Sequence, residues 1–325
     1  MTGTEIIVLI FQKTLIFAIP LLIVALAGVF AERSGIVNLA LEGEMIFGAF
    51  AGALYVFYVQ RSGAMADHQQ WMFVIALLIS GIAAAIFSLL LSVAAIKFKV
   101  DQTIAGTALN MLAPAVFLTI CLVIFSQEKL TMNPMPNYVI LLPGENLNPI
   151  VDIFFNKAYI STYICIFLYI VLSIWLYKSK VGTHMRACGE HPQAADSVGI
   201  NVAKMRYLGT TISGFLAGVG GYAYIAATSA GTAESGVGGM GFLALAIMIF
   251  GNWSPLGIAL GSLLFGFLKC IGPLSSLIPF LKALNIDIYF YNIIPYLIVI
   301  FVLIIFRNKS GCPKAEGIPY EKGQR

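Results

Sequence analysis

Long apolar runs, separated by short polar stretches, make up most of this 325-residue chain. A run of about 18 or more apolar residues is long enough to cross a bilayer as an α-helix. The pattern predicts about nine membrane spans, of which the seventh and eighth are short. The predicted spans are Thr14–Ala31, Gly35–Val59, Trp71–Ile96, Ile104–Phe125, Tyr159–Tyr177, Tyr207–Ser229, Gly239–Gly251, Leu256–Ile271 and Ile293–Phe306.

The composition supports a membrane protein and excludes a soluble fold. Hydrophobic residues make up 59% of the chain and charged residues only 10%, whereas a soluble domain carries about a quarter charged residues. A soluble fold of this composition would have too few polar groups to cover its surface. We therefore predict an all-α, polytopic transmembrane helical bundle, a single domain over residues 1–325, in the cell membrane.

Basic residues gather at some loops and not at others, and this predicts the orientation of the spans. Loops rich in Lys and Arg face the cytoplasm. The basic excess lies at Lys97 with Lys99, in the polar insert Lys178–Arg206, and in the tail 307–325. Alternation outward from these anchors places the N-terminus and the loops Ser126–Ala158 and Gly272–Asn292 on the outside.

Two stretches of the chain resemble each other, Ser34–Gly48 and Ser235–Gly251. On the predicted topology they enter the membrane from opposite sides, which is typical of inverted repeats with glycine-broken helices that form a transport site. The alternative is chance, because glycine-containing apolar stretches are frequent in a chain of this composition. Trp253 follows the second stretch at a predicted cytoplasmic turn, so we expect it to be an interfacial anchor.

Polar residues cluster where the second span begins, in SGIVNLALEGEM. A carboxylate at membrane depth is costly and usually faces a cavity or a partner. Glu42 is therefore the main candidate for lining a substrate pathway, with Asn38 one helical turn away and Glu44 as the alternative. Both carboxylates could instead pair with Arg33 as structural anchors. Asn110 in the fourth span could bind a polar solute or bond a neighbouring helix.

The sequence shows no set of residues for catalysis, metal binding or nucleic-acid binding. Its three His and five Cys are scattered without ligand spacing, and no nucleophile–base pair can be proposed. It also lacks the G-x-x-x-x-G-K-[ST] loop that cradles phosphates and a basic stripe for nucleic acid. We therefore predict no cofactor in this chain.

Three motifs in order resemble one family. The pattern G-x-x-x-R-A-x-G-x-N-P-x-A-A-x-x-x-G-I runs through the polar insert, with His191 in place of Asn. Glu32–Gly43 looks like the entry motif of nucleoside permeases. Gly251–Gly266 resembles the G-x-x-x-P-x-G-x-x-x-G-x-x-x-x-G stretch of the same family. From about residue 14 to residue 308, the chain resembles permease subunits of ATP-binding cassette (ABC) importers in the nucleoside and simple-sugar branch. The insert residues that match are Gly182, Arg186, Ala187, Gly189, Pro192, Ala194, Ala195, Gly199 and Ile200.

The resemblance implies a transport subunit, not an enzyme. Its substrate would be a nucleoside, or a simple sugar such as ribose, moved inward by alternating access. It also implies a cytoplasmic ABC ATPase that binds ATP and Mg, a second and related permease chain in a heterodimer, and an extracytoplasmic substrate-binding protein, with membrane lipid around the spans.

A short helix over Glu190–Val198 suits the contact with the ATPase. Pro192 is tolerated in a first helical turn, and the two alanines that follow favour a helix and close packing. The alternative is a solvated connecting loop, although a bare connector could be far shorter. The residues predicted to couple to the ATPase are Arg186, Gly189, Glu190, His191, Pro192, Ala194 and Ala195.

Two other classes of function are alternatives to this one. An ion-gradient-driven secondary transporter would use Glu42 or Glu44 as a proton or cation site and would need no ATPase. An integral membrane enzyme would need clustered polar residues at one membrane face, and the sequence shows no such cluster.

Overall fold

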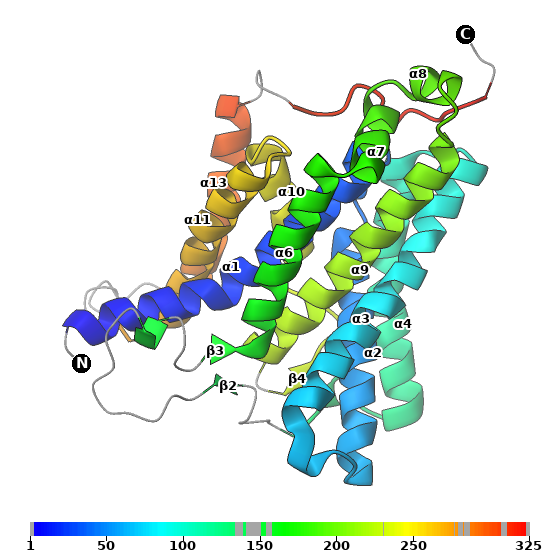
Figure 1. The fold of residues 1–325 in the computed structure, drawn as a ribbon. Coiled ribbons are helices and arrows are strands. Elements are labelled where there is room, and N and C mark those ends of the chain that lie inside the picture. Colours follow the sequence, from blue (N-terminus) through cyan, green and yellow to red (C-terminus); the bar gives the residue numbers. More distant parts are fainter. Residues whose placement is uncertain are drawn as a thin grey trace.

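The computed structural model describes residues 3–133, 139–140, 151–153, 158–229, 231–275, 277–278, 282, 287–306 and 311–322. Most of the predicted outer loop Ser126–Ala158 lies outside the described residues. The elements form a bundle of long tilted helices (Figure 1). Its helices are α1 (Gly3–Arg33), α2 (Leu41–Ser62), α3 (Gln69–Ser92), α4 (Gln102–Ile120), α6 (Ile160–Lys178), α7 (Lys180–Glu190), α8 (Pro192–Ser197), α9 (Val202–Thr228), α10 (Met240–Phe250), α11 (Pro255–Leu274) and α13 (Ile288–Phe306).

Short elements complete the bundle. A 3₁₀ turn, η1 (Ala66–His68), precedes α3, and π-helical turns, η2 (Val93–Lys97) and η3 (Cys121–Phe125), extend α3 and α4. The strands are two residues long and antiparallel: β1 (Leu130–Thr131) pairs with β4 (Thr232–Ala233), and β2 (Val139–Ile140) pairs with β3 (Ala158–Tyr159).

Each of the nine predicted spans falls on a helix, which confirms the all-α polytopic class. In the described part of the chain, six helices are long and apolar enough to cross a membrane, and α10 and the described apolar part of α13 are shorter. The sixth predicted span, α9, is 27 residues long and lies against α1, α2 and α3. Its many small residues suit a helix that packs against protein instead of lipid.

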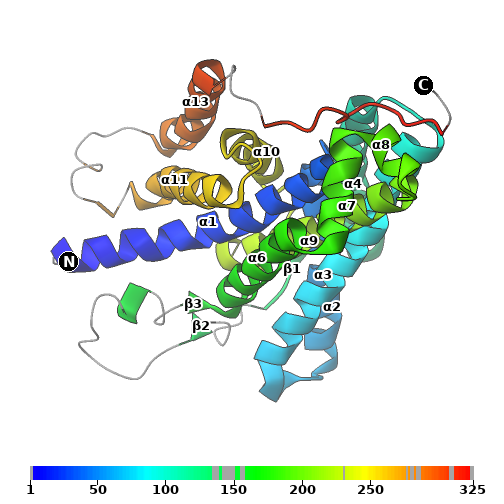
Figure 2. The same cartoon turned by 45° about the horizontal axis from the view of Figure 1, so that its top comes forward.

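The basic segments of the sequence, which are the polar insert and the tail, lie at one end of the bundle (Figure 1). The end of α1, α7, α8 and the tail segment (residues 311–322) lie together at one end, which we call the basic end (Figure 2). The start of α1 and the strands lie at the opposite end (Figure 1). This arrangement matches the predicted topology, in which the insert and the tail share one side of the membrane and the N-terminus takes the other.

Glycines let three helices approach closely at the centre of the bundle. A Cβ on Gly218 of α9 would lie 2.6 Å from the Cβ of Ala84 in α3, and one on Gly48 of α2 would lie 2.8 Å from the Ser80 carbonyl oxygen. The Ser80 hydroxyl donates to the Gly218 carbonyl at 2.5 Å. The glycines of α9 and α2 therefore allow tight packing of these helices against α3.

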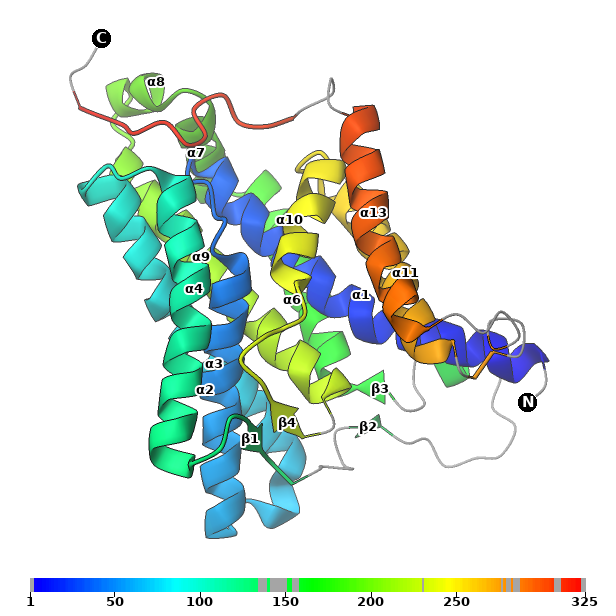
Figure 3. The ribbon, with the colours of Figure 1, turned by 180° about the vertical axis from the view of Figure 1, so that it is seen from behind.

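Two helices begin inside the bundle and not at its ends. The chain is extended before α2 and again before α10, and α2 and α10 run in opposite directions from neighbouring starting points (Figure 3). The predicted span at Gly35–Val59 is corrected accordingly, because its helix begins only at Leu41. Asn38 and Met240, close to the two starting points, are fully buried. The similar stretches noticed in the sequence thus form two oppositely directed broken helices.

Candidate functional site

Glu42 joins the two broken helices. Its carboxylate accepts the amide of Gly239, the N-cap of α10, at 2.9 Å and the amide of Gly241 at 2.6 Å. The first amides of a helix have no partner within the helix, and the helix dipole favours a negative charge there. Glu42, in the first turn of α2, therefore caps α10.

A second group of side chains holds the same backbone from the other side. The Tyr296 hydroxyl donates to the Gly238 carbonyl at 2.7 Å, and the Lys269 ammonium donates to the Tyr296 oxygen at 3.1 Å. Gly238 and Gly239 both have positive φ, at 64° and 73°. Only glycine adopts this conformation without cost, so the turn before α10 depends on both residues.

The other polar residues of this region make a buried network. The Asn38 amide donates to both oxygens of Glu44, at 3.1 and 3.0 Å, and to the Ser213 hydroxyl at 2.9 Å. Asn110 ties α4 to the break, because it donates to the Leu39 carbonyl at 2.7 Å and accepts the Gly43 amide at 2.7 Å.

The structure therefore brings the predicted pathway residues together, each with a protein partner. Asn38 and Glu44 bond each other, Asn110 bonds the backbone of the break, and Glu42 bonds α10. The predicted structural alternative for Asn110, a bond between helices, is present. That these four side chains line a substrate pathway stays a prediction.

A cavity of about 560 Å³ lies beside the Glu42 contact. It shares Gly238, Lys269 and Tyr296 with that contact and adds Tyr224 of α9 and Asn292 of α13. Aromatic side chains with a few polar groups are typical of small-molecule sites. These residues were not predicted from the sequence, although Lys269 is an ionisable residue within an apolar run, which is a signal of function in a membrane protein.

The polar insert folds into two helices at the basic end. The Ser179 hydroxyl accepts the Gly182 amide at 3.0 Å and so caps α7. Pro192 occupies the first turn of α8, as predicted, but α8 is shorter than the predicted Glu190–Val198 helix and Glu190 ends α7 instead. His191 lies between the two helices as the N-cap of α8. Pro192 and Ala195 are buried, whereas His191 and Ala194 are exposed.

The predicted coupling residues on α7 contact the membrane helices directly. Glu190 pairs with Arg33 at the end of α1 over 3.4 Å. Arg186 donates to the Tyr177 carbonyl at 3.3 Å and lies over the Tyr177 ring at the end of α6. A Cβ on Gly189 would lie 3.0 Å from the Arg33 carbonyl carbon. A displacement of α7 would therefore move the ends of both helices. That these residues couple to an ATPase stays a prediction.

The tail segment crosses the basic end and contacts several turns there. The Ala315 amide donates to the Gly189 carbonyl at 2.9 Å, and the Gly311 amide donates to the Asn252 side-chain oxygen at 2.5 Å. Lys99, between α3 and α4, pairs with Glu321. From the sequence this segment is only a polar tail, since it has no hydrophobic periodicity.

The expectation for Trp253 was wrong. The indole is 4% exposed, and its N–H donates to the Glu32 carboxylate at 2.5 Å. A buried carboxylate needs such a donor, so Trp253 connects the α10–α11 turn to the end of α1.

Comparison with known proteins shows the family. A model of the branched-chain amino acid transport system permease component matches residues 10–304. The chain belongs to this permease family. The permease is 40% identical to the guanosine ABC transporter permease protein NupQ of Bacillus subtilis over 323 residues, which is 99% of each chain.

Two further relatives extend this comparison. The permease is 36% identical to the nucleoside ABC transporter permease protein NupC of Lactococcus lactis, over 97% of this chain and 98% of that one. It is 24% identical to the guanosine ABC transporter permease protein NupP of Bacillus subtilis, over 79% of this chain and 71% of that one. No solved structure matches the permease. The family and the apolar helices together make it a multi-pass membrane protein.

Proposed function

We propose that this chain is the permease subunit of an ABC importer that carries nucleosides into the cell. The observation that carries the proposal is similarity along almost the whole chain to two permeases named for guanosine and for nucleosides. Both relatives are named ABC transporter permeases. The alternative of an ion-gradient-driven transporter has no such support, and Glu42 is engaged by backbone amides instead of facing an open ion site.

The cavity beside α10 is the proposed nucleoside site. A purine ring can stack on Tyr224 or Tyr296, and the ribose hydroxyls can bond Asn292 and Lys269. These groups lie beside the turn that begins α10, so movement of α10 against α2 would reshape the cavity. The hydrogen bonds of the Glu42 and Tyr296 side chains would rearrange in that movement, because both side chains bond the turn.

The exposed face of α7 and α8 is the proposed contact with the ATPase, which would bind the ATP and Mg. Ala194 and His191 are exposed there. Gly189 and Glu190 lie behind that face against α1, so a push on α8 is passed to the membrane helices through close contacts. This arrangement is stiffer than a solvated connecting loop would be.

We further propose a second, related permease chain and an extracytoplasmic substrate-binding protein as partners. Two different guanosine permeases of Bacillus subtilis are similar to this chain, at 40% and 24% identity, which supports a pair of unlike chains. Large apolar side chains on α4 and α13 are exposed, among them Met111 and Phe301 at 77% and 69%. Lipid and a second permease chain would cover such faces.

The test is uptake by the complete transporter in proteoliposomes. We expect ATP-dependent uptake of radiolabelled guanosine that excess unlabelled nucleoside suppresses and excess ribose does not. Tyr224→Leu should reduce uptake at least tenfold, whereas the matched control Tyr58→Leu, at an exposed ring on α2, should not. Uptake that persists without ATP and stops when ion gradients are collapsed would refute the proposal.

A further inference from the structure

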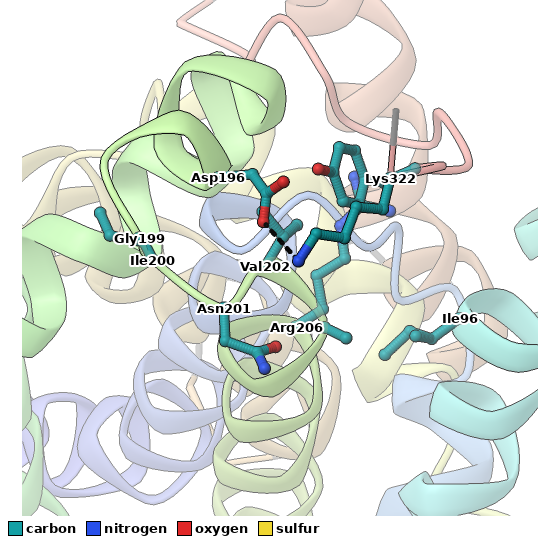
Figure 4. A pocket seen from close by; sticks show the side chains of 10 residues that line it. Ile96, Asp196, Gly199, Ile200, Asn201, Val202, Arg206 and Lys322 are labelled. Carbon is teal, nitrogen blue, oxygen red and sulfur yellow. Dashed lines mark ion pairs between the residues drawn. The ribbon is translucent and has the colours of Figure 1, made fainter. Parts of the chain in front are cut away.

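A pocket of about 460 Å³ lies at the basic end and shares no lining residue with the nucleoside cavity. Its walls come from four segments: the end of α8 with the loop after it, the first turns of α9, the tail segment, and η2 through Ile96. In Figure 4 the Asp196–Lys322 ion pair spans one side of the pocket, and Arg206 extends from α9 toward the tail segment.

Arg206 is the unusual member of this pocket. Its side chain is only 2% exposed, yet its Nε and Nη2 atoms have no hydrogen-bond partner among the residues that the structure describes. Its guanidinium lies against Gly35 of the α1–α2 break, where a Cβ would be 3.0 Å from Nη2. A buried charge without a partner is costly. An acceptor that entered the pocket would remove that cost.

The start of α9 adds further donors. Val202 and Ala203 are the first two residues of this 27-residue helix, and both line the pocket. Their amides have no acceptor within the helix, whereas the third amide, of Lys204, is already taken by the Asn201 side chain at 2.9 Å. A helix N-terminus also attracts anions through its dipole.

The charges around the pocket favour a single anionic group. Arg206 and Lys322 are cationic, and Asp196 is the acidic side chain in the lining, 4.0 Å from Lys322. The pair Asp196–Lys322 is neutral as a unit and lies at the rim, since the Lys322 side chain is 83% exposed. The net charge left inside is that of Arg206.

We propose that this pocket binds a phosphate group. Phosphate offers several acceptor oxygens, which suits a guanidinium that binds two oxygens at once together with the free amides of Val202 and Ala203. The group can come from a soluble phosphate in the cytoplasm or from the headgroup of an anionic lipid. A bound phosphate would join α9 to the tail segment and to the loop that follows α8.

The first arm of the test uses the full chain, with its partner subunits, in maltoside micelles, which carry no phosphate. Inorganic phosphate is titrated at constant ionic strength set with chloride, and binding is followed by calorimetry. The second arm omits free phosphate and adds phosphatidylglycerol to the micelles, and the rise in unfolding temperature is measured. Saturable binding in the first arm assigns the site to soluble phosphate, and stabilisation in the second arm alone assigns it to lipid.

Three variants distinguish phosphate binding in this pocket from a nonspecific attraction of anions to basic residues. Arg206→Gln should weaken the response at least tenfold. Ala203→Asp should do the same while it folds normally, because an acidic residue is favourable in the first helical turn and Ala203 is exposed. Lys204→Gln removes a neighbouring exposed charge that does not line the pocket and should leave the response unchanged. No response in either arm, or an equal response in wild type and Ala203→Asp, would overturn the proposal.

Discussion

The contact between α7 and α1 can be tested at Gly189. A Cβ there would lie 3.0 Å from the Arg33 carbonyl carbon and 3.4 Å from the Glu32 carbonyl oxygen, and closer still to the Arg33 oxygen. These neighbours are backbone atoms, so α7 must move away from the end of α1 to admit a side chain. Gly189→Ala is the purely steric change, and Gly189→Asp adds a negative charge to a buried site.

The expected cost follows from two opposing terms. Forcing an extra carbon into a packed contact costs about 1–3 kcal/mol, and replacing Gly by Ala in a helix recovers up to about 1 kcal/mol. Global stability of Gly189→Ala should therefore fall by only about 0–2 kcal/mol. The steric cost of about 1–3 kcal/mol acts on the α7–α1 contact itself. It corresponds to about a 5- to 150-fold decrease in the equilibrium constant for packing α7 against α1.

The assay compares folding, ATPase activity and uptake in the same proteoliposomes. We expect Gly189→Ala to lower ATP-driven guanosine uptake at least fivefold, and Gly189→Asp to abolish it, with a thermal unfolding transition retained in both. Gly236→Ala is the control, because a Cβ there meets no atom of a described residue within 4 Å. Normal ATP-driven uptake by Gly189→Asp would refute the reasoning that α7 transmits movement to α1.

Three other changes test separate parts of the structure. Ala195→Leu, at a site 3% exposed, should lower stability by about 1–3 kcal/mol in thermal unfolding, whereas Ala194→Leu, at an exposed site, should keep stability and weaken co-purification of the ATPase. Gly218→Ala should lower the unfolding temperature without a change in helix content by circular dichroism, because its Cβ would meet the α3 backbone at Ser80. Burial raises the pKa of Glu316 in the tail segment. The docked tail therefore binds more protons than the released tail. Docking should then weaken as the pH rises from the ordinary carboxyl pKa of about 4.3 through the raised pKa. Limited proteolysis of the tail across this range should show that dependence, and Glu316→Gln should remove it.

Most of the helices were predictable, because an apolar run of about 20 residues can satisfy its backbone hydrogen bonds in a bilayer only as a helix. The break before Leu41 was also visible, since Asn38 and two carboxylates interrupt an apolar run. The partners of those residues were not, because the Gly239 and Gly241 amides that bind Glu42 come from a segment almost 200 positions away. Pairing at that distance is set by packing, which a single sequence does not record.

The features missed at the basic end have a similar cause. Trp253 satisfies the usual pattern of an interfacial aromatic residue, and only the position of Glu32 shows that it is buried instead. The tail segment is held through backbone amides, such as that of Ala315. Backbone bonds leave no trace in residue type, so a polar tail and a docked one look alike in sequence.

The shortness of α10 bears on how the permease can change shape. Its 11 residues reach about 16 Å, roughly half of the ~30 Å hydrocarbon core. Such a helix is fixed to one water interface only, and its inner end rests on a carboxylate cap. It can therefore tilt or slide without drawing a polar loop into the lipid, against the resistance of its buried apolar packing and of the hydrogen bonds to Glu42. α10 can therefore move inside the bundle while the long helices stay fixed in the membrane.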